Sequence, residues 1–160
     1  MKIAICDISD AHPDDVHYLD PVFHDFGGTL SFHGPVSTVK CLEDNSKLSD
    51  AFDEPGNGRV LVVDGAGSLK RALCGGNQAA KAAKHGWAGV IIYGAIRDTA
   101  ELSVVALGVK ALAAFPLRPK KEGAGERDVP ITIAGQMIRP GDYIYADGDG
   151  IIVADKKLHT

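Results

Sequence analysis

The sequence has 160 residues, which is enough for one domain of ordinary size to bury its own core. Apolar residues make up 45% of the chain and charged residues 24%, a balance typical of globular proteins that excludes a disordered chain. The net charge of −4 and the pI near 5.8 lack the excess of positive charge that marks nucleic-acid-binding proteins. We therefore expect one domain over residues 1–160, with no direct nucleic acid partner.

The cysteines and the N-terminal segment indicate in which cellular compartment the protein is expected. Cys6, Cys41 and Cys74 are odd in number and form no C-x-x-C pair, which argues against a disulfide scaffold or a zinc site. The apolar run at residues 3–6 is too short for a signal peptide, and no run approaches the roughly 20 residues that span a bilayer. We expect a cytoplasmic protein with no membrane partner.

The first third of the chain predicts little regular structure. Residues 7–28 are rich in Asp, His and Pro, and suggest one short helix after Ser9. Apolar residues, Thr and Ser from Thr29 to Leu42, around Gly34-Pro35, predict two short strands joined by a turn. Residues 45–52 carry Leu48 and Phe52 at helical spacing.

The centre of the chain predicts a strand–helix–strand unit. Residues 59–64 form a β-branched run whose lack of alternation indicates a strand of a parallel sheet, buried on both faces. Residues 77–85 are rich in alanine and are followed by Gly86, which is typical of a helix and its C-terminal cap. A second buried strand follows at residues 89–93.

The C-terminal part is predicted to be rich in strands. Residues 99–107 suggest a helix and residues 109–115 a strand. Short strands are then expected at 131–133, 143–146 and 151–153, with tight turns at 140–142 and 147–150. The whole pattern predicts an α/β domain with a mixed sheet and no linker that would divide it.

The segment Gly75-Gly76-Asn77-Gln78 is the first candidate binding element. It lies where the predicted helix begins, and its glycines allow backbone N–H groups to approach a ligand closely. Free N–H groups at a helix N-terminus bind anions, including carboxylates. The plainer alternative is that Asn77 only caps the helix.

The pair Arg97-Asp98 is the second candidate, because it follows the strand at 89–93, and ligand sites of open α/β sheets lie at such strand ends. Arginine offers a planar fork that matches carboxylates, and aspartate offers an oxygen ligand for a cation such as Mg²⁺. Glu101 would share the face of Asp98 if the segment is helical, where it could orient a water. The alternative is a surface ion pair with a helix-terminal aspartate.

Three other patterns are weaker indications of a metal or catalytic site. His12, His17, His24 and His33 show no known zinc spacing, and we interpret them as mostly solvated. Residues 147–150 are too short for a calcium loop and favour a hairpin turn. Cys74 adjoins the glycine loop, but the sequence shows no base beside it.

Several segments together resemble a known family. Gly76, twenty intervening residues, Arg97-Asp98, two residues and Glu101 reproduce a pattern of the class II 4-hydroxy-4-methyl-2-oxoglutarate aldolases. This pattern is accompanied by family-like segments at residues 26–28, 62–68, 86–89, 123–126, 140–142 and 146–147. The chain therefore resembles, over nearly its whole length, the family that holds these aldolases and the regulator of ribonuclease activity A (RraA).

This resemblance implies a fold, an assembly and a site. The fold would be a swivelling β/β/α domain in a homotrimer with sites near the subunit interfaces. Gly75 to Gln78 would bind the substrate carboxylate, Arg97 would bind the substrate, and Asp98 would hold a divalent cation, Mg²⁺ or Mn²⁺.

The activity that the resemblance implies is cleavage of 4-hydroxy-4-methyl-2-oxoglutarate, a 2-oxo acid, into two pyruvates. Decarboxylation of oxaloacetate would follow from the same pyruvate enolate. Arg97, Asp98 and Glu101 are the expected catalytic residues. The alternative, from the other branch of the family, is a protein that binds and inhibits ribonuclease E.

Overall fold

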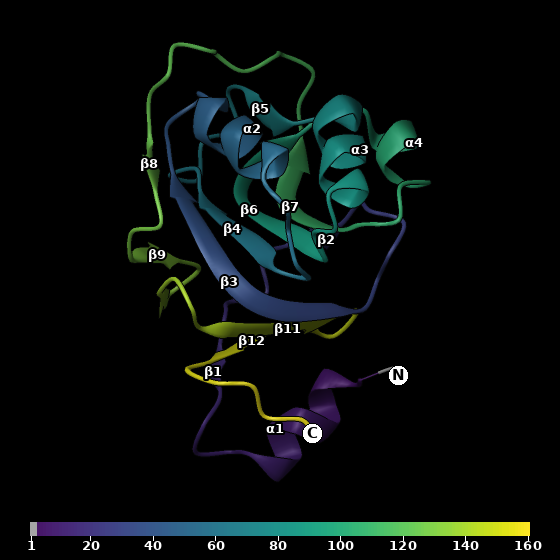
Figure 1. Cartoon of the computed structure of the whole chain (residues 1–160), viewed down its shortest axis with the longest axis vertical. Helices are drawn as coiled ribbons and strands as arrows, with labels where there is room; N and C mark the ends of the chain where they lie inside the picture. The colour runs from purple at the N-terminus through teal and green to yellow at the C-terminus, as the bar shows by residue number, and fades with distance from the viewer. Residues whose placement is uncertain (1–2) are drawn as a thin grey trace.

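The computed structural model describes residues 3–160 as a curled mixed sheet with few helices (Figure 1). The helices are α1 (Ile5–Ala11), α2 (Ser46–Asp53), α3 (Gly76–Lys84) and α4 (Thr99–Leu102). The strands are β1 (His17–Tyr18), β2 (His24–Asp25), β3 (Phe32–Lys40), β4 (Val60–Asp64), β5 (Ala72–Cys74), β6 (Gly89–Ile96), β7 (Gly108–Ala114), β8 (Glu126–Arg127), β9 (Ile131–Ile133), β10 (Gln136–Ile138), β11 (Tyr143–Asp147) and β12 (Gly150–Ala154). The predicted α/β class with a strand-rich C-terminal part is confirmed. No helix of residues 3–160 has the length and apolar character that crossing a bilayer requires.

The centre of the sheet is parallel, as the buried strands predict. β3, β4, β6 and β7 lie side by side in that order and run in the same direction, and the short β5 also pairs with β6. The predicted unit of strand β4, helix α3 and strand β6 is confirmed. The carboxyl ends of β5 and β6 therefore meet at one edge of the sheet.

The region around Gly34-Pro35 corrects the sequence analysis, because one strand replaces the two strands and turn that were predicted. β3 runs without interruption through both residues. Its residues 32–35 pair with β11 in the antiparallel direction, and its residues 36–40 pair with β4 in the parallel direction. Pro35 is exposed and lies where the strand changes partners, so the missing N–H of proline does not interrupt the ladder.

Two further predictions were wrong in extent. The N-terminal helix begins at Ile5 and not after Ser9, because Ile5 and Ile8 are buried against the C-terminal strands. The helix predicted over 99–107 ends at Leu102, and strand β5 at Ala72–Cys74 lies where no strand was predicted. Helix α2 and strands β9, β11 and β12 lie where they were predicted, whereas the short strands β8 and β10 were not predicted.

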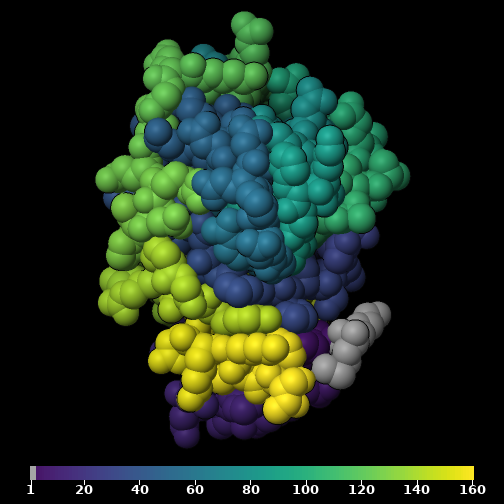
Figure 2. Space-filling view, in the orientation of Figure 1, coloured from purple at the N-terminus to yellow at the C-terminus, as the bar shows by residue number. Residues whose placement is uncertain are grey.

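Two apolar layers cover the two faces of the central sheet. Leu61 and Val63 pack under helices α2 and α3, whereas Val60 and Val62 face β9 to β12. A third cluster fixes α1 on β11 and β12, and Figures 1 and 2 show the N-terminal and C-terminal segments packed together at the lower end of the molecule. Helices α3 and α4 lie at the opposite end (Figure 1).

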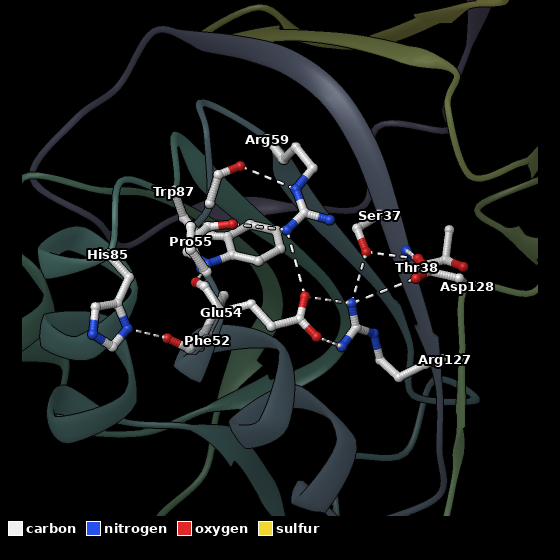
Figure 3. Close-up of polar contacts among 11 residues, drawn as sticks. Ser37, Thr38, Phe52, Glu54, Pro55, Arg59, His85, Trp87, Arg127 and Asp128 are labelled. Atoms are coloured by element: carbon white, nitrogen blue, oxygen red, sulfur yellow. Dashed lines mark hydrogen bonds and ion pairs between the residues drawn. The ribbon is translucent and has the colours of Figure 1, made fainter.

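A polar clamp ties the loop after α2 to strand β8 (Figure 3). Arg127 makes two bonds to the Glu54 carboxylate, Nη1 to Oε2 at 3.0 Å and Nη2 to Oε1 at 3.3 Å. Arg127 also donates to Ser37 on β3, and Arg59 lies 3.5 Å from Glu54 while its guanidinium stacks over the Trp87 ring. Arg59 and Trp87 precede β4 and β6, so this part of the clamp lies at the ends of these strands that are opposite to Arg97.

We expect the clamp to make stability depend on pH. Arg127 holds the pKa of Glu54 below its usual range, so Glu54 stabilises the folded chain fully above about pH 5 and progressively less as the pH falls through its folded-state pKa. Glu54→Gln should lower the Tm by about 2–4 °C at pH 7 and by less near pH 3. Thermal unfolding from pH 3 to pH 8 measures this. Glu126→Gln is the matched control, and an equal loss in Tm at both pH values would contradict the expectation.

Candidate active site

The glycine loop and the Arg97-Asp98 pair meet at the carboxyl ends of β5 and β6. Gly75 follows β5 directly and precedes α3, and Arg97 follows β6 directly. The Arg97 amide donates to the Cys74 carbonyl at 2.9 Å, which holds the two strand ends together. The structure therefore brings together the two elements that the sequence proposes as a site.

Asp98 is fixed against the loop by its side chain and its backbone. The Gly76 amide donates to Asp98 Oδ2 at 2.8 Å. Asp98 has a left-handed conformation, with φ of 61° and ψ of 49°, and its carbonyl accepts the Leu102 amide to begin helix α4. An aspartate adopts this conformation more readily than most residues. The carboxylate is therefore held at the helix terminus, with about a third of the side chain exposed.

The two glycines are needed because the acidic side chains lie directly over them. A β-carbon on Gly75 would collide with Asp98 Oδ2 and would approach Arg97 Cγ to 3.0 Å. A β-carbon on Gly76 would collide with the Glu101 carboxylate. Glu101 therefore reaches the same site as Asp98, on the first turns of α3 and α4.

The site combines positive and negative groups within a short span. Arg97 Nε lies 3.8 Å from Asp98 Oδ1, and the two side chains are 38% and 36% exposed. The amides of Asn77 and Gln78 lie in the first turn of α3, where no carbonyl of the helix can accept them. The free amides and Arg97 favour an anion, whereas Asp98 and Glu101 place negative charge beside the same helix terminus.

Side chains of α2 hold helix α3 in place through contacts that the sequence analysis did not identify. Gln78 Nε2 donates to Ser49 Oγ on α2, and Lys81 Nζ donates to the same hydroxyl at 2.9 Å and pairs with Asp53. The spacing of Gln78 and Lys81 on one helix face was the signal available for this bracing. These contacts orient α3 so that its N-terminus points at Asp98.

Cys74 adjoins the loop but has no nucleophilic character here. Its thiol is fully buried beneath the site, and burial, reinforced by the charge of Asp98, raises its pKa to about 12. A thiol with this pKa holds its proton at neutral pH. Its role is to fill the core under Gly75.

The side chains present fit a divalent cation that keeps part of its water. Residues 3–160 contain no group of three or more His, Cys, Asp or Glu side chains arranged around a metal position. Mg²⁺ is commonly held through one or two carboxylates, with water and substrate supplying the other ligands. Asp98 offers Oδ1 while Oδ2 is anchored to the loop, and Glu101 lies beside it. This donor set suits a magnesium-type site and not a zinc site.

Comparison with known proteins identifies the family. The family model described as RraA-like, Aldolase/RraA, matches residues 5–153. The chain belongs to the RraA-like family. This confirms the resemblance inferred from the residues around Gly76, Arg97 and Glu101.

Relatives and solved structures cover almost the whole chain. A protein of Alkalilimnicola ehrlichii named "Putative 4-hydroxy-4-methyl-2-oxoglutarate aldolase" is 54% identical over 158 residues, which are 99% of this chain and 98% of the relative. A protein of Albidiferax ferrireducens with the same name is 51% identical, with 98% of each chain covered.

Two RraA-like structures superpose on nearly the whole fold. The structure described as the RNA-processing inhibitor RraA from Thermus thermophilis has a TM-score of 0.95 at 44% identity, covering 99% of this chain and 96% of its own. A structure from Geobacillus kaustophilus HTA426, described as an S-adenosylmethionine: 2-dimethylmenaquinone methyltransferase, has a TM-score of 0.96 at 42% identity, covering 98% of this chain and 97% of its own. The RraA-like fold thus occurs under three different functional descriptions, so the function is argued from the site.

Proposed function

We propose that this protein is a divalent-metal-dependent aldolase that cleaves 4-hydroxy-4-methyl-2-oxoglutarate into two pyruvates. The observation that carries the proposal is the contact between Gly76 and Asp98, which holds a carboxylate at the start of α3, with Arg97 Nε 3.8 Å from that carboxylate. The names of relatives about 50% identical to this chain support the same reaction class. In this proposal the protein works as a homotrimer.

Substrate binding follows from the charges at the loop. The 2-oxo acid places its carboxylate at the amides of Asn77 and Gln78, and Arg97 donates charge-assisted hydrogen bonds to the same end of the molecule. These contacts fix the bond to be broken relative to Asp98 and Glu101. Asp98 would hold the divalent cation, which would supply Lewis-acid stabilisation of the negative charge that develops on the 2-oxo acid.

The reaction breaks one carbon–carbon bond. The substrate hydroxyl loses its proton, its carbon becomes the carbonyl of the first pyruvate, and the bonding electron pair passes into the enolate of the second. Arg97 stabilises the negative oxygen of this enolate, which gains a proton on carbon to give pyruvate. Glu101, which lies over Gly76, is the candidate to orient the water that accepts the hydroxyl proton.

The direct test is the release of pyruvate from 4-hydroxy-4-methyl-2-oxoglutarate by the full chain, followed through NADH oxidation by added lactate dehydrogenase. Steady-state release should require Mg²⁺ or Mn²⁺, stop with a chelator and return when the cation is restored. Release no faster than in a blank with Mg²⁺ alone would reject the aldolase assignment.

Oxaloacetate should be decarboxylated by the same site. Loss of carbon dioxide from oxaloacetate and loss of pyruvate from the aldol substrate leave the same pyruvate enolate, so stabilising that enolate lowers both barriers. We expect oxaloacetate to disappear faster with enzyme and Mg²⁺ than with Mg²⁺ alone, and we expect Arg97→Ala to remove the difference. Aldol cleavage without any enzyme-dependent decarboxylation would rule out the shared enolate.

A second candidate function is binding and inhibition of ribonuclease E. The observation that favours it is the 44% identity, over nearly the whole chain, to the structure described as an RNA-processing inhibitor. RNA cleavage by ribonuclease E with added protein separates the candidates. Arg97→Ala should still inhibit if the protein binds through another surface, whereas it should lose aldol cleavage.

A further inference from the structure

A cavity lies at the end of the molecule away from the glycine loop. Its volume is about 350 Å³, and it is enclosed by α1, β1, the segment at residues 19–25, Lys110 of β7 and the β11–β12 turn with the start of β12. Gly75, Gly76, Arg97 and Asp98 do not line it. Figure 1 shows α1 and β12 at the lower end of the molecule and α3 and α4 at the upper end. The aldolase proposal therefore makes no use of this cavity.

The walls of the cavity combine an apolar surface with several polar side chains. Leu19, Phe23 and Ile151 contribute aliphatic and aromatic surface, and Ile5 and Ile152 extend it towards α1. Tyr18 forms part of the rim, where its hydroxyl lies 2.5 Å from Ser9 Oγ. Small-molecule sites have this character, with a concave apolar surface and some polar groups.

A buried basic side chain, Lys110, lines the cavity. Lys110 is on β7 between Val109 and Ala111, and its side chain is 4% exposed. Its Nζ donates to Asp25 Oδ1 at 2.9 Å and to the Asp147 carbonyl at 2.7 Å. A buried ammonium group is expensive unless it is paired, and these two acceptors account for two of its three N–H bonds. These two contacts leave the third N–H without an acceptor among residues 3–160, on a side chain that lines the cavity.

The carboxylates that line the cavity disfavour a bound anion. Asp10, Asp20 and Asp149 line it, and none of them forms an ion pair with a lysine or arginine among residues 3–160. The charge of Lys110 is already balanced by Asp25. A second carboxylate brought into this space would meet net negative charge, so an uncharged acceptor suits Lys110 better.

We propose that this cavity binds a small uncharged molecule with an apolar body and one carbonyl or phenolic oxygen, which accepts a hydrogen bond from Lys110. The apolar body lies on Leu19, Phe23 and Ile151. This ligand class differs from the 2-oxo acid anions expected at the glycine loop. The site is independent of the aldolase proposal and stands if that proposal fails.

Four probes of similar size but different head groups test the proposal. Acetophenone carries a carbonyl, toluene no polar group, benzoate a negative charge and benzylamine a positive charge. Binding of each to the full chain is measured by saturation-transfer NMR and by titration calorimetry. Acetophenone should bind best, about tenfold more tightly than toluene or benzoate, because only acetophenone gives Lys110 an uncharged acceptor.

Two variants assign the binding to this cavity. Lys110→Met keeps the length of the side chain and should abolish the preference for acetophenone over toluene, whereas the same change at exposed Lys156 should leave it intact. Cys6→Trp places a large side chain at an exposed lining position and should weaken binding of all four probes without disturbing the core. Thermal unfolding of each variant verifies its fold.

Four results would overturn the proposal. Equal or tighter binding of benzoate would indicate an anion site, and equal or tighter binding of benzylamine would indicate that the acidic rim dominates. A Lys110→Met variant with a lower Tm but an unchanged preference would show that Lys110 only joins β7 to its neighbours. Failure of every probe to bind at millimolar concentration would show that the cavity is not a ligand site.

Discussion

Asp98→Asn should reduce aldol cleavage by about a thousandfold and remove its response to Mg²⁺. Asparagine keeps the left-handed backbone conformation and a side-chain oxygen that can accept the Gly76 amide, so only the charge is lost. Alanine at this position would combine the loss of charge with backbone strain, which makes asparagine the cleaner change.

The Asp98 prediction is measured by initial rates across a Mg²⁺ titration, with Mn²⁺ binding followed by electron paramagnetic resonance. Asp155→Asn, an exposed carboxylate elsewhere on the chain, is the control and should retain full activity. If purified Asp98→Asn kept its magnesium-dependent activity, the cation would be held by other residues and the metal assignment would be wrong.

Arg97→Ala should lower kcat/KM by about a hundredfold to a thousandfold, the usual effect of removing one donor to a developing oxyanion. Arg97 is proposed to contact the bound substrate and the enolate, so kcat should fall and KM should rise. Arg97→Lys should recover only part of the loss because an ammonium group cannot reproduce the planar fork. The Tm should hardly change, since the side chain is 38% exposed and the backbone bond to Cys74 remains.

Steady-state kinetics of these two variants, with Mn²⁺ binding as a second measurement, separate Arg97 from Asp98. Arg97→Ala should still bind the cation, whereas Asp98→Asn should not. Arg118→Ala removes an exposed arginine outside the site and serves as the control. A loss in Arg97→Ala that was restricted to cation binding would place Arg97 in the metal site and not against the substrate.

The central part of the fold could be predicted because its residues leave few choices. The run at residues 60–63 is buried on both faces of a parallel sheet, and its β-branched side chains alternate between two apolar clusters. The helix that starts at Gly76 has alanines on its buried face and ends before Gly86, which has a positive φ. Here the local pattern and the tertiary packing favour the same structure.

The errors arose where tertiary contacts override local signals. Gly34-Pro35 is a typical turn sequence, yet pairing with β11 on one side and β4 on the other keeps β3 extended. The short helix near the N-terminus begins at Ile5 because partners more than 130 residues away cover Ile5 and Ile8. No short-range pattern contains that information.

The candidate site was also predicted only in part: the positions of its residues were predicted, and their contacts were not. The positions of Gly75 to Gln78 and of Arg97 and Asp98 followed from the ends of predicted elements. Their actual contacts did not, because the approach of Asp98 to Gly76 depends on the pairing of β5 with β6 and on the left-handed conformation of Asp98. The bracing of Gln78 and Lys81 by Ser49 likewise depends on how α2 packs against α3.

Strand β3 belongs to both halves of the molecule, the antiparallel C-terminal strands and the parallel central sheet. Its first four residues belong to the antiparallel ladder with β11, and the next five belong to the parallel ladder with β4. Separation of the C-terminal strands would remove the hydrogen-bonding partner of the first part of β3. It would also expose the apolar face that Val60 and Val62 share with these strands. Opening of either half would therefore expose core surface of the other, so we expect such opening to cost more free energy than the fraying of a terminus.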